Sequence, residues 1–407
     1  MRVKFLSLII ITIFSVTTLT ACTNNLSLPP EAEKVTSTRN PAYSLLFIIN
    51  SQNATARLSA LEAPRILAHS FLAAYAAYSS AKDGMNKEYL AVKAGAEVGA
   101  TLHIDRVRAA NIRSIVDSFR TGNHSAEDKL ALEIAEKVLA ISKKDGHDES
   151  FGLYQPTDGT TSFNWEPTGR GTYGLEPMWG SIKPLIKESL ECSLPTPDEE
   201  LIKSQALKML ADFSLEKAVG QDVLWWLAGN GTPTPSGQWL GIASNALRDK
   251  GLSVEDSLLT LTAASIASSD SAIIAWKEKY RHNIARPETL WKILASDQSS
   301  IPTLPRETPP HPSYPSGHSV FGGAVTTILK DTIGQSPLRD TLPADLYAPG
   351  QRRDWVSIEK ALEEASGSRI NSGFHLPLDT SAGEELGGCV ANKVIANYKN
   401  LLKEINQ

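Results

Sequence analysis

Apolar residues recur at helical spacing through most of this chain, and this periodicity limits the fold more than any other feature. In residues 63–80, for example, Ile66, Leu72, Ala73 and Ala76 fall on one stripe of a helix. No segment shows a convincing two-residue alternation typical of a half-buried strand. The sequence therefore predicts an all-α fold built from helical bundles.

Two helix starts can be located from capping patterns. Ser125 and Ser253 are each followed three residues later by an aspartate, Asp128 and Asp256. A hydroxyl at the first position and an acid at the fourth can satisfy the free N–H groups of a first turn. We therefore expect a helix to begin at each serine.

Two long segments interrupt the helical pattern. Residues 154–184 are rich in Gly, Pro, Thr and Trp, and residues 301–317 contain six prolines. Proline at that density is incompatible with a helix interior. Long irregular segments in a compact helical protein are usually functional, so we expect these loops to roof a site.

The first residues have the pattern of an export signal. A basic start is followed by an apolar run from Phe5 to Leu19 and by Leu-Thr-Ala-Cys, which ends at Cys22. This ending resembles the lipobox of bacterial lipoproteins, which implies a signal peptide over 1–21 and a lipidated Cys22. Polar residues 22–42 are expected to form a flexible tether, and 43–407 a single all-α catalytic domain. No later segment is expected to cross a membrane.

The location implied is the cell envelope of a bacterium, with the lipid as the only membrane contact. Thr23 follows the cysteine where an aspartate often accompanies inner-membrane retention, which favours the outer membrane. The formal charge is −5, so no basic field for nucleic acid exists. Three cysteines in 407 residues exclude a disulfide scaffold, and Cys192 and Cys389 could pair or remain two thiols.

Three segments of the C-terminal half carry the chemistry. The first contains Lys279 and Arg286, seven residues apart, which would share a helical face if the helix continues to Pro287. The second contains Ser316, a candidate N-cap, and Gly317, which permits a sharp turn. A Ser-Gly turn at a helix N-terminus offers backbone N–H groups to an anion.

The second and third segments also supply two histidines. His318 follows Gly317 directly, and His375 lies six residues after Arg369. Asp379 is four residues after His375 and could orient its imidazole. With Lys279 and Arg286, these residues suit a tetrahedral oxyanion, because guanidinium groups make bidentate contacts to such ligands. The site is expected within residues 270–380.

Together the three segments resemble the signature shared by type 2 phosphatidic acid phosphatases, bacterial acid phosphatases and vanadium-dependent haloperoxidases. The resemblance implies that His375 is the vanadium ligand or the phosphatase nucleophile and that His318 is the general acid or base. It assigns the oxyanion contacts to five further residues: Lys279, Arg286, Ser316, Gly317 and Arg369.

Several features resemble the haloperoxidase branch, in particular its bacterial, bromoperoxidase-like members. Trp276 precedes Lys279 by three residues, where that branch often has an aromatic lining the halide pocket. His311 precedes His318 by seven residues, where algal bromoperoxidases have a histidine. The chain is also longer than the phosphatase branch usually needs. One departure is Leu376, because haloperoxidases often have Trp or Phe after the ligand histidine.

The resemblance implies an enzyme that uses one vanadate per chain and hydrogen peroxide to oxidise a halide to a hypohalous acid equivalent. A histidine at position 311 favours bromide or iodide over chloride, and a small organic acceptor would be halogenated. The alternative is a vanadate-free acid phosphatase with the same residues. A third interpretation, a binding protein for oxyanions, would not need both histidines. A homodimer is left open.

Overall fold

The computed structural model describes residues 40–118, 120, 122–168, 173–340 and 351–406. The expected signal peptide, Cys22 and the tether up to residue 39 lie outside these ranges. Helix α2 (Pro41–Ala56) begins where Asn40 accepts a hydrogen bond from the backbone of Ala42, with Pro41 at the first helical position. Residues 41 and 42, expected in the tether, are therefore helical.

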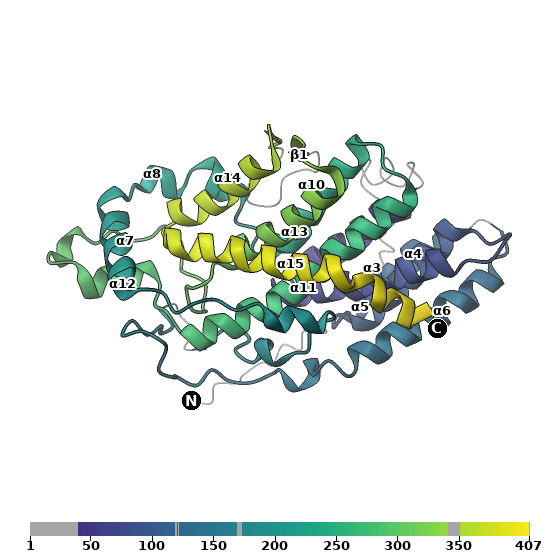
Figure 1. Ribbon diagram of the computed structural model, residues 1–407, viewed down its shortest axis with the longest axis horizontal. Helices are drawn as coiled ribbons and strands as arrows, with labels where there is room; N and C mark the ends of the chain where they lie inside the picture. The colour runs from purple at the N-terminus through teal and green to yellow at the C-terminus, as the bar shows by residue number, and fades with distance from the viewer. Residues whose placement is uncertain (1–39, 119, 121, 169–172, 341–350, 407) are drawn as a thin grey trace, which may run out of the picture.

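Five helices form an N-terminal group, drawn in purple and blue in Figure 1. After α2 come α3 (Glu62–Ser80), α4 (Lys87–Leu102), α5 (Arg106–Ser118) and α6 (Ser125–Ser142). The predicted helix start at Ser125 is confirmed, but the predicted capping pattern is not, because Ser125 is the first helical residue and His124 is at the cap position. The backbone N–H of Ser125 instead donates to the Asn123 side chain at 3.1 Å.

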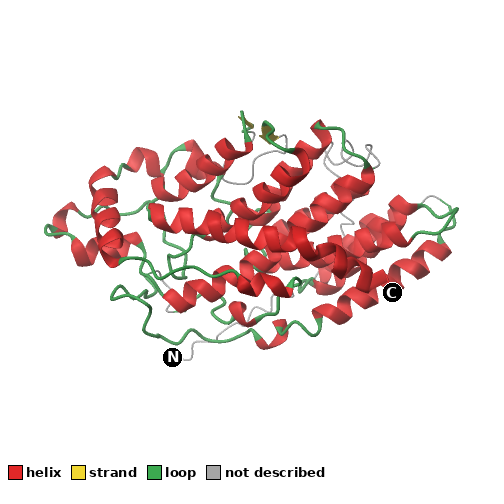
Figure 2. Ribbon diagram, viewed as in Figure 1, coloured by secondary structure: helices red, strands yellow, loops and turns green. Residues whose placement is uncertain are grey.

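The C-terminal half is also helical and wraps around the central helix α11 (Val254–His282). It contains α10 (Thr234–Asp249), α13 (Gly317–Ile333), α14 (Ile358–Asn371) and α15 (Pro377–Asn406). Shorter helices cover one end: α7 (Glu199–Asp212), α8 (Leu215–Ala218), α9 (Gln221–Trp225) and α12 (Pro287–Leu294). The predicted all-α fold is confirmed, as Figure 2 shows.

Helix α11 is the core of the molecule. The Ser253 side chain accepts a hydrogen bond from the Asp256 backbone, which confirms the predicted start. Among the described helices, α11 alone is long and apolar enough to cross a membrane, which differs from the sequence expectation. Because 94% of its most apolar window is buried inside the protein, α11 is a core helix.

Helices α13 and α15 pack at very short distance. A Cβ atom built on Gly387 of α15 would lie 2.1 Å from the carbonyl oxygen of Val320 on α13. A side chain at this position would force the backbones apart, so the contact requires glycine. The contact fixes the N-terminal part of α13 against α15.

The two irregular segments lie against the C-terminal end of α11. Asn164 pairs with Ile284, and the backbone N–H of Leu175 donates to the carbonyl of Pro310 at 2.7 Å. Four short 3₁₀ helices occur in the connections: η1 (His147–Glu149), η2 (Trp179–Ser181), η3 (Lys187–Glu191) and η4 (Gln298–Ser300). The only strands described, β1 (Leu338–Asp340) and β2 (Arg353–Trp355), form an antiparallel pair that the sequence did not predict.

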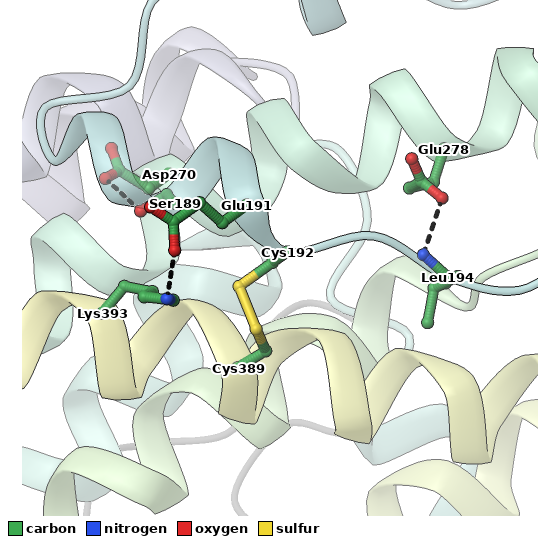
Figure 3. The surroundings of a disulfide bond; sticks show 8 residues. All are labelled: Ser189, Glu191, Cys192, Leu194, Asp270, Glu278, Cys389 and Lys393. Atoms are coloured by element: carbon green, nitrogen blue, oxygen red, sulfur yellow. Dashed lines mark hydrogen bonds and ion pairs between the residues drawn. A yellow bond between two sulfur atoms is a disulfide. The ribbon is translucent and has the colours of Figure 1, made fainter.

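Cys192 and Cys389 form a disulfide, which settles the alternative left open by the sequence (Figure 3). The bond ties the segment after η3 to α15 across 197 positions of sequence. On either side of Cys192 the same segment is held to α11: Asp270 accepts from the backbone N–H of Ile186, and Glu278 from that of Leu194, both at 2.9 Å. The disulfide therefore closes a loop that is also bonded to the central helix.

Candidate active site

Lys279 lies one turn before the end of α11 and is fully buried. Its ammonium group donates to the carbonyl oxygens of Pro312, Ser313 and Pro315 at 2.7, 3.0 and 2.5 Å. Three carbonyls satisfy the three donors of the ammonium group but bring no negative charge. This lysine therefore fixes the proline-rich loop while its charge remains unbalanced.

Arg286 reaches the same place from a different element. The shared helical face predicted for Lys279 and Arg286 is wrong, because α11 ends at Asn283, a left-handed residue with φ of 51°. Arg286 is instead the N-cap residue of α12 and is fully buried. Its guanidinium donates to the carbonyls of His311 and Phe374, each at 2.9 Å.

His375 lies directly beyond that guanidinium. Its Nε2 atom accepts from Arg286 Nη1 at 2.9 Å, and its Nδ1 atom is 3.3 Å from the Asp379 carboxylate. This pairing assigns the ring proton to Nδ1 and leaves the lone pair on Nε2. His375 is buried, and burial together with the Arg286 charge lowers its pKa well below the ordinary value. The imidazole is therefore neutral.

Asp379 makes further contacts besides the predicted one to His375. Its Oδ2 atom accepts from the Ser313 hydroxyl at 2.6 Å and from the Leu376 backbone at 2.9 Å. Asp379 occupies the first turn of α15, and its own carbonyl accepts from the backbone N–H of Ser316 at 2.8 Å. Ser313 was missed by the sequence analysis, because its partner lies 66 residues away and no spacing connects them.

Ser316 and Gly317 begin α13. Ser316 occupies the predicted N-cap position, but its side chain makes no capping bond and accepts from the Ser319 hydroxyl at 3.2 Å. A Cβ on Gly317 would lie 3.5 Å from the ring of Trp276, so the start of α13 borders α11 here. The first N–H groups of a long helix lack helical partners and favour an anion.

Arg369 and His318 form the other side of the site. Arg369, on α14, is buried, and its guanidinium donates to the Ser368 hydroxyl at 3.0 Å. Its Nη1 atom lies 3.4 Å from Nε2 of His318, which is also 3.1 Å from the carbonyl of Leu227. His318 is half-buried, and desolvation and the Arg369 charge lower its pKa well below the ordinary value.

Trp276 and His311 lie together beside Lys279 and Arg286. Their ring centroids are 4.9 Å apart, and the Lys279 ammonium is 5.7 Å from the Trp276 ring centre. The Trp276 indole donates to the carbonyl of Leu175, and the His311 ring accepts from Arg286 at 3.0 Å. The two residues predicted to line a halide pocket are thus brought to one wall of the site.

The charges of the site are not balanced. Within the described ranges, none of Lys279, Arg286 and Arg369 forms an ion pair with a carboxylate, although all three are buried. Burial lowers the pKa of Arg286 to about 10 and that of Arg369 to about 9. Buried charges of one sign are costly unless an anion joins them, so the donor set fits a tetrahedral oxyanion.

A conventional divalent metal centre is absent from the described part of the chain. No group of three His, Cys, Asp or Glu side chains there could hold a metal ion. A vanadate fits this arrangement, because it needs one imidazole nitrogen for the metal and cationic donors for its oxygens. The lone pair of His375 Nε2 and the three unbalanced cations supply that set.

Comparisons with known proteins agree with this geometry. The sequence model of the vanadium chloroperoxidase (VCPO) second helical-bundle domain matches residues 259–404. The vanadium chloroperoxidase of Curvularia inaequalis is 32% identical over 155 residues, which are 33% of this chain and 22% of that protein's length. The matched part thus spans less than a quarter of the curated relative.

The similarity in fold to solved structures covers most of the chain. The crystal structure of a bacterial vanadium-dependent iodoperoxidase superposes with a TM-score of 0.74 at 23% identity, covering 88% of this chain and 96% of the other. A holo-type bacterial vanadium-dependent chloroperoxidase gives 0.67 at 15% identity, with 87% and 96% covered. The chain therefore has the fold of the vanadium haloperoxidases, and the sequence of its C-terminal bundle is similar to theirs.

Proposed function

We propose that this protein is a vanadium-dependent haloperoxidase that oxidises iodide or bromide with hydrogen peroxide to a hypohalous acid equivalent. One observation carries the proposal: three buried cations without described carboxylate partners lie around two histidines, and one of these cations, Arg286, donates to the unprotonated Nε2 of His375. The family relationship supports the same reaction class.

In this proposal His375 binds vanadium through Nε2, and Asp379 and Ser313 keep the ring in the required tautomer. Lys279, Arg286 and Arg369 hold the oxygens once Lys279 turns an N–H away from the loop carbonyls, with the Ser316 hydroxyl and the Gly317 N–H as uncharged donors. When bound, vanadate supplies a Lewis acid that activates hydrogen peroxide without changing its own oxidation state.

His318 is the proposed general base. It borders Arg369, is half-buried and therefore reachable from solvent, and is neutral in the absence of an anion. An anion held by Arg369 offsets the cationic field that depresses the pKa of His318. The imidazole then becomes a better proton acceptor for hydrogen peroxide.

The preference for iodide or bromide rests on His311 and Trp276. The two rings, tilted by 43° to each other, present a polarisable aromatic wall beside the cations. The iodoperoxidase among the structural relatives supports a soft halide, although its sequence is only 23% identical. We propose a small organic acceptor as the final target of the oxidised halogen.

The second candidate is a phosphomonoesterase with the same residues. The neutral His375 Nε2 would attack phosphorus, and His318 would protonate the leaving group. The tautomer fixed by Asp379 favours either reaction, because a free lone pair on Nε2 serves as nucleophile or as metal ligand.

A pair of assays separates the two functions. The vanadate-reconstituted protein should oxidise iodide and bromide with hydrogen peroxide, and the vanadate-free protein should hydrolyse p-nitrophenyl phosphate slowly. His375→Ala should abolish halide oxidation, whereas His103→Ala, in the N-terminal group of helices, should retain it. Strong hydrolysis without halide oxidation would make the phosphatase the better assignment.

We further propose that the protein is exported and anchored through Cys22. The disulfide supports an oxidising compartment outside the cytoplasm. Cys22→Ser should move the protein from the membrane fraction to the soluble envelope fraction, and mass spectrometry of the wild type should find a diacylglyceryl group on Cys22. An unmodified Cys22 in the mature chain would contradict the anchor.

A further inference from the structure

The proline-rich loop lies against the turn that joins Arg369 to His375. Gly373 in this turn has φ of +81°, and a Cβ atom there would lie 2.5 Å from Leu304 Cδ2. Only glycine combines that backbone angle with so close a neighbour. Two residues after Leu304, the loop carries the charged side chain of Arg306.

Arg306 is half-buried and incompletely paired. Its Nη1 atom is inaccessible to solvent and has no hydrogen-bond partner among the residues that the structure describes. Burial of Arg369 is the main cause of its lowered pKa, and the charge of Arg306 lowers this pKa further. Two neighbouring guanidinium groups, neither in an ion pair with a described carboxylate, repel each other unless an anion is shared between them.

A surface cavity borders one of these two arginines. Its volume is about 520 Å³, and Arg306 lines it together with Leu304 and Thr308. Two acidic residues, Glu288 and Glu307, also line it. Glu288 is neutralised at the rim, because it forms an ion pair with Lys292 at 2.9 Å and accepts from Thr308 at 3.4 Å.

The wall formed by Trp276 and His311, proposed above to set the halide preference, offers an incoming anion no N–H at Trp276 Nε1 or at His311 Nδ1. The indole N–H already donates to the Leu175 carbonyl, and Nδ1 of His311 faces both Arg286 and the carbonyl of Pro312. Arg306, in contrast, carries a buried N–H without a partner among the described residues, and its charge acts on Arg369.

We propose that Arg306 and Arg369 together form a halide-binding subsite on the His318 side of the oxyanion site. The inference deepens the proposed function and rests on it for the identity of the anion. A halide suits this place because a monovalent sphere needs no directional set of donors. A second tetrahedral oxyanion would need several donors, as found around Lys279 and Arg286.

The equilibrium test uses vanadate-free protein and sodium bromide. The ⁸¹Br NMR line broadens when bromide exchanges with a protein site, so no activity is needed for this measurement. Arg306→Met should remove most of the excess line width, and Arg306→Lys should restore part of it. Lys292→Met is the matched control, because it removes one positive charge from the same cavity at a residue already paired with Glu288.

The kinetic test uses the vanadate-loaded protein. Arg306→Met should raise the KM for iodide roughly tenfold, the value of one charge-assisted contact, and change kcat by less than about threefold. Its affinity for vanadate, measured by calorimetry, should change by less than about twofold. Lys292→Met should leave all three quantities within about twofold of the wild type.

The outcomes separate the two proposals. Bromide binding that depends on Arg306, in a wild type that does not oxidise halides, would leave the anion subsite standing and overturn the proposed function. Halide oxidation with an unchanged KM and line width in Arg306→Met would overturn the subsite alone. A loss of vanadate affinity with an unchanged KM for iodide would also overturn it, because Arg306 would then belong to the oxyanion site.

Discussion

Nη1 of Arg286 lies 2.9 Å from Nε2 of His375, so the guanidinium occupies the direction in which the imidazole lone pair points. A ligand on that nitrogen must take this place. Arg286 can then turn its N–H groups from the histidine to the oxygens of the ligand, since it remains anchored by the carbonyls of His311 and Phe374. Without a ligand, the Arg286 guanidinium therefore occupies the position beside His375 Nε2 that the bound group would take.

Asp379→Asn should weaken vanadate binding more than phosphate binding. The neutral amide is a poorer partner for the His375 N–H, and such outer partners change metal affinity on the order of 10- to 100-fold. Inorganic phosphate forms no bond to the histidine and should lose no more than about threefold. Calorimetric titration of both anions measures this difference, with Ser313→Ala as the control that keeps the carboxylate. Equal losses for the two anions would contradict a vanadium bond to His375.

Inorganic phosphate should raise the Tm of the vanadate-free protein, because it neutralises buried cations in the folded state only. At 100 times its Kd, a ligand adds about 2.7 kcal/mol to the free energy of unfolding. Arg286→Met should abolish most of the Tm shift in differential scanning fluorimetry. Arg65→Met, which removes a buried arginine paired with Asp145 at 2.8 Å, should lower Tm but keep the shift. A shift retained in Arg286→Met would place the anion elsewhere.

Removal of the disulfide should lower stability. Closing a loop of 197 positions restricts the unfolded chain by about 5 kcal/mol in the chain-entropy description, and observed effects are commonly 2–5 kcal/mol. Cys192→Ser with Cys389→Ser should therefore unfold at lower urea concentration. Reductant should destabilise the wild type and leave the double variant unchanged. A further response of the double variant to reductant would show that the effect arises elsewhere.

Gly387→Ala should be strongly destabilising, because its Cβ would meet the Val320 carbonyl at 2.1 Å. Overpacking against backbone typically costs about 1–3 kcal/mol or more. The neighbouring Gly388→Ala is the matched control, since its Cβ would lie 3.5 Å from the Thr327 hydroxyl. That variant should be neutral or gain up to about 1 kcal/mol in helix propensity. Urea unfolding of both variants tests the packing of α13 on α15.

The stability contributed by Glu278 should depend on pH in the acid range. Although burial opposes ionisation, hydrogen bonds from His282, Arg281 and Leu194 lower its pKa to about 2. The folded pKa is below the unfolded one, so this contribution is present above about pH 4.5 and disappears as the pH falls through about 2. It is on the order of 3 kcal/mol.

Glu278→Gln should remove that pH dependence. The free energy of unfolding of the wild type minus that of the variant, measured in urea between pH 2 and 6, should increase with pH and then level off. Taking the difference at each pH removes the contributions of titrating groups that both proteins share, including the buried Asp270. If the difference did not change with pH over this range, the stability contributed by Glu278 would not depend on its ionisation.

The helical class follows from short-range patterns, whereas the candidate site residues came from three short motifs and the family that they resemble. The spacing of His375 and Asp379 and the Ser253 cap describe contacts within one turn, and the structure has both. The all-α assignment follows from the same local periodicity.

The failures lie where long-range packing decides. Asn283 ends α11 in a left-handed conformation before Arg286, a break that the spacing from Lys279 did not reveal. The pairing of Cys192 with Cys389, the Ser313 contact to Asp379 and the position of Leu304 on Gly373 all join residues far apart in sequence. No periodicity or spacing rule records such distances.

The disulfide has a consequence for the survival of the protein during the reaction proposed for it. A hypohalous acid attacks thiolates and methionine sulfur most readily, so an enzyme that releases it is exposed to self-inactivation. Cys192 and Cys389 are already oxidised to the disulfide and no longer offer a thiolate. The sequence contains only four methionines, of which Met209 is buried. The bond that fastens the loop to α15 therefore also withdraws two of the most vulnerable targets from the oxidant.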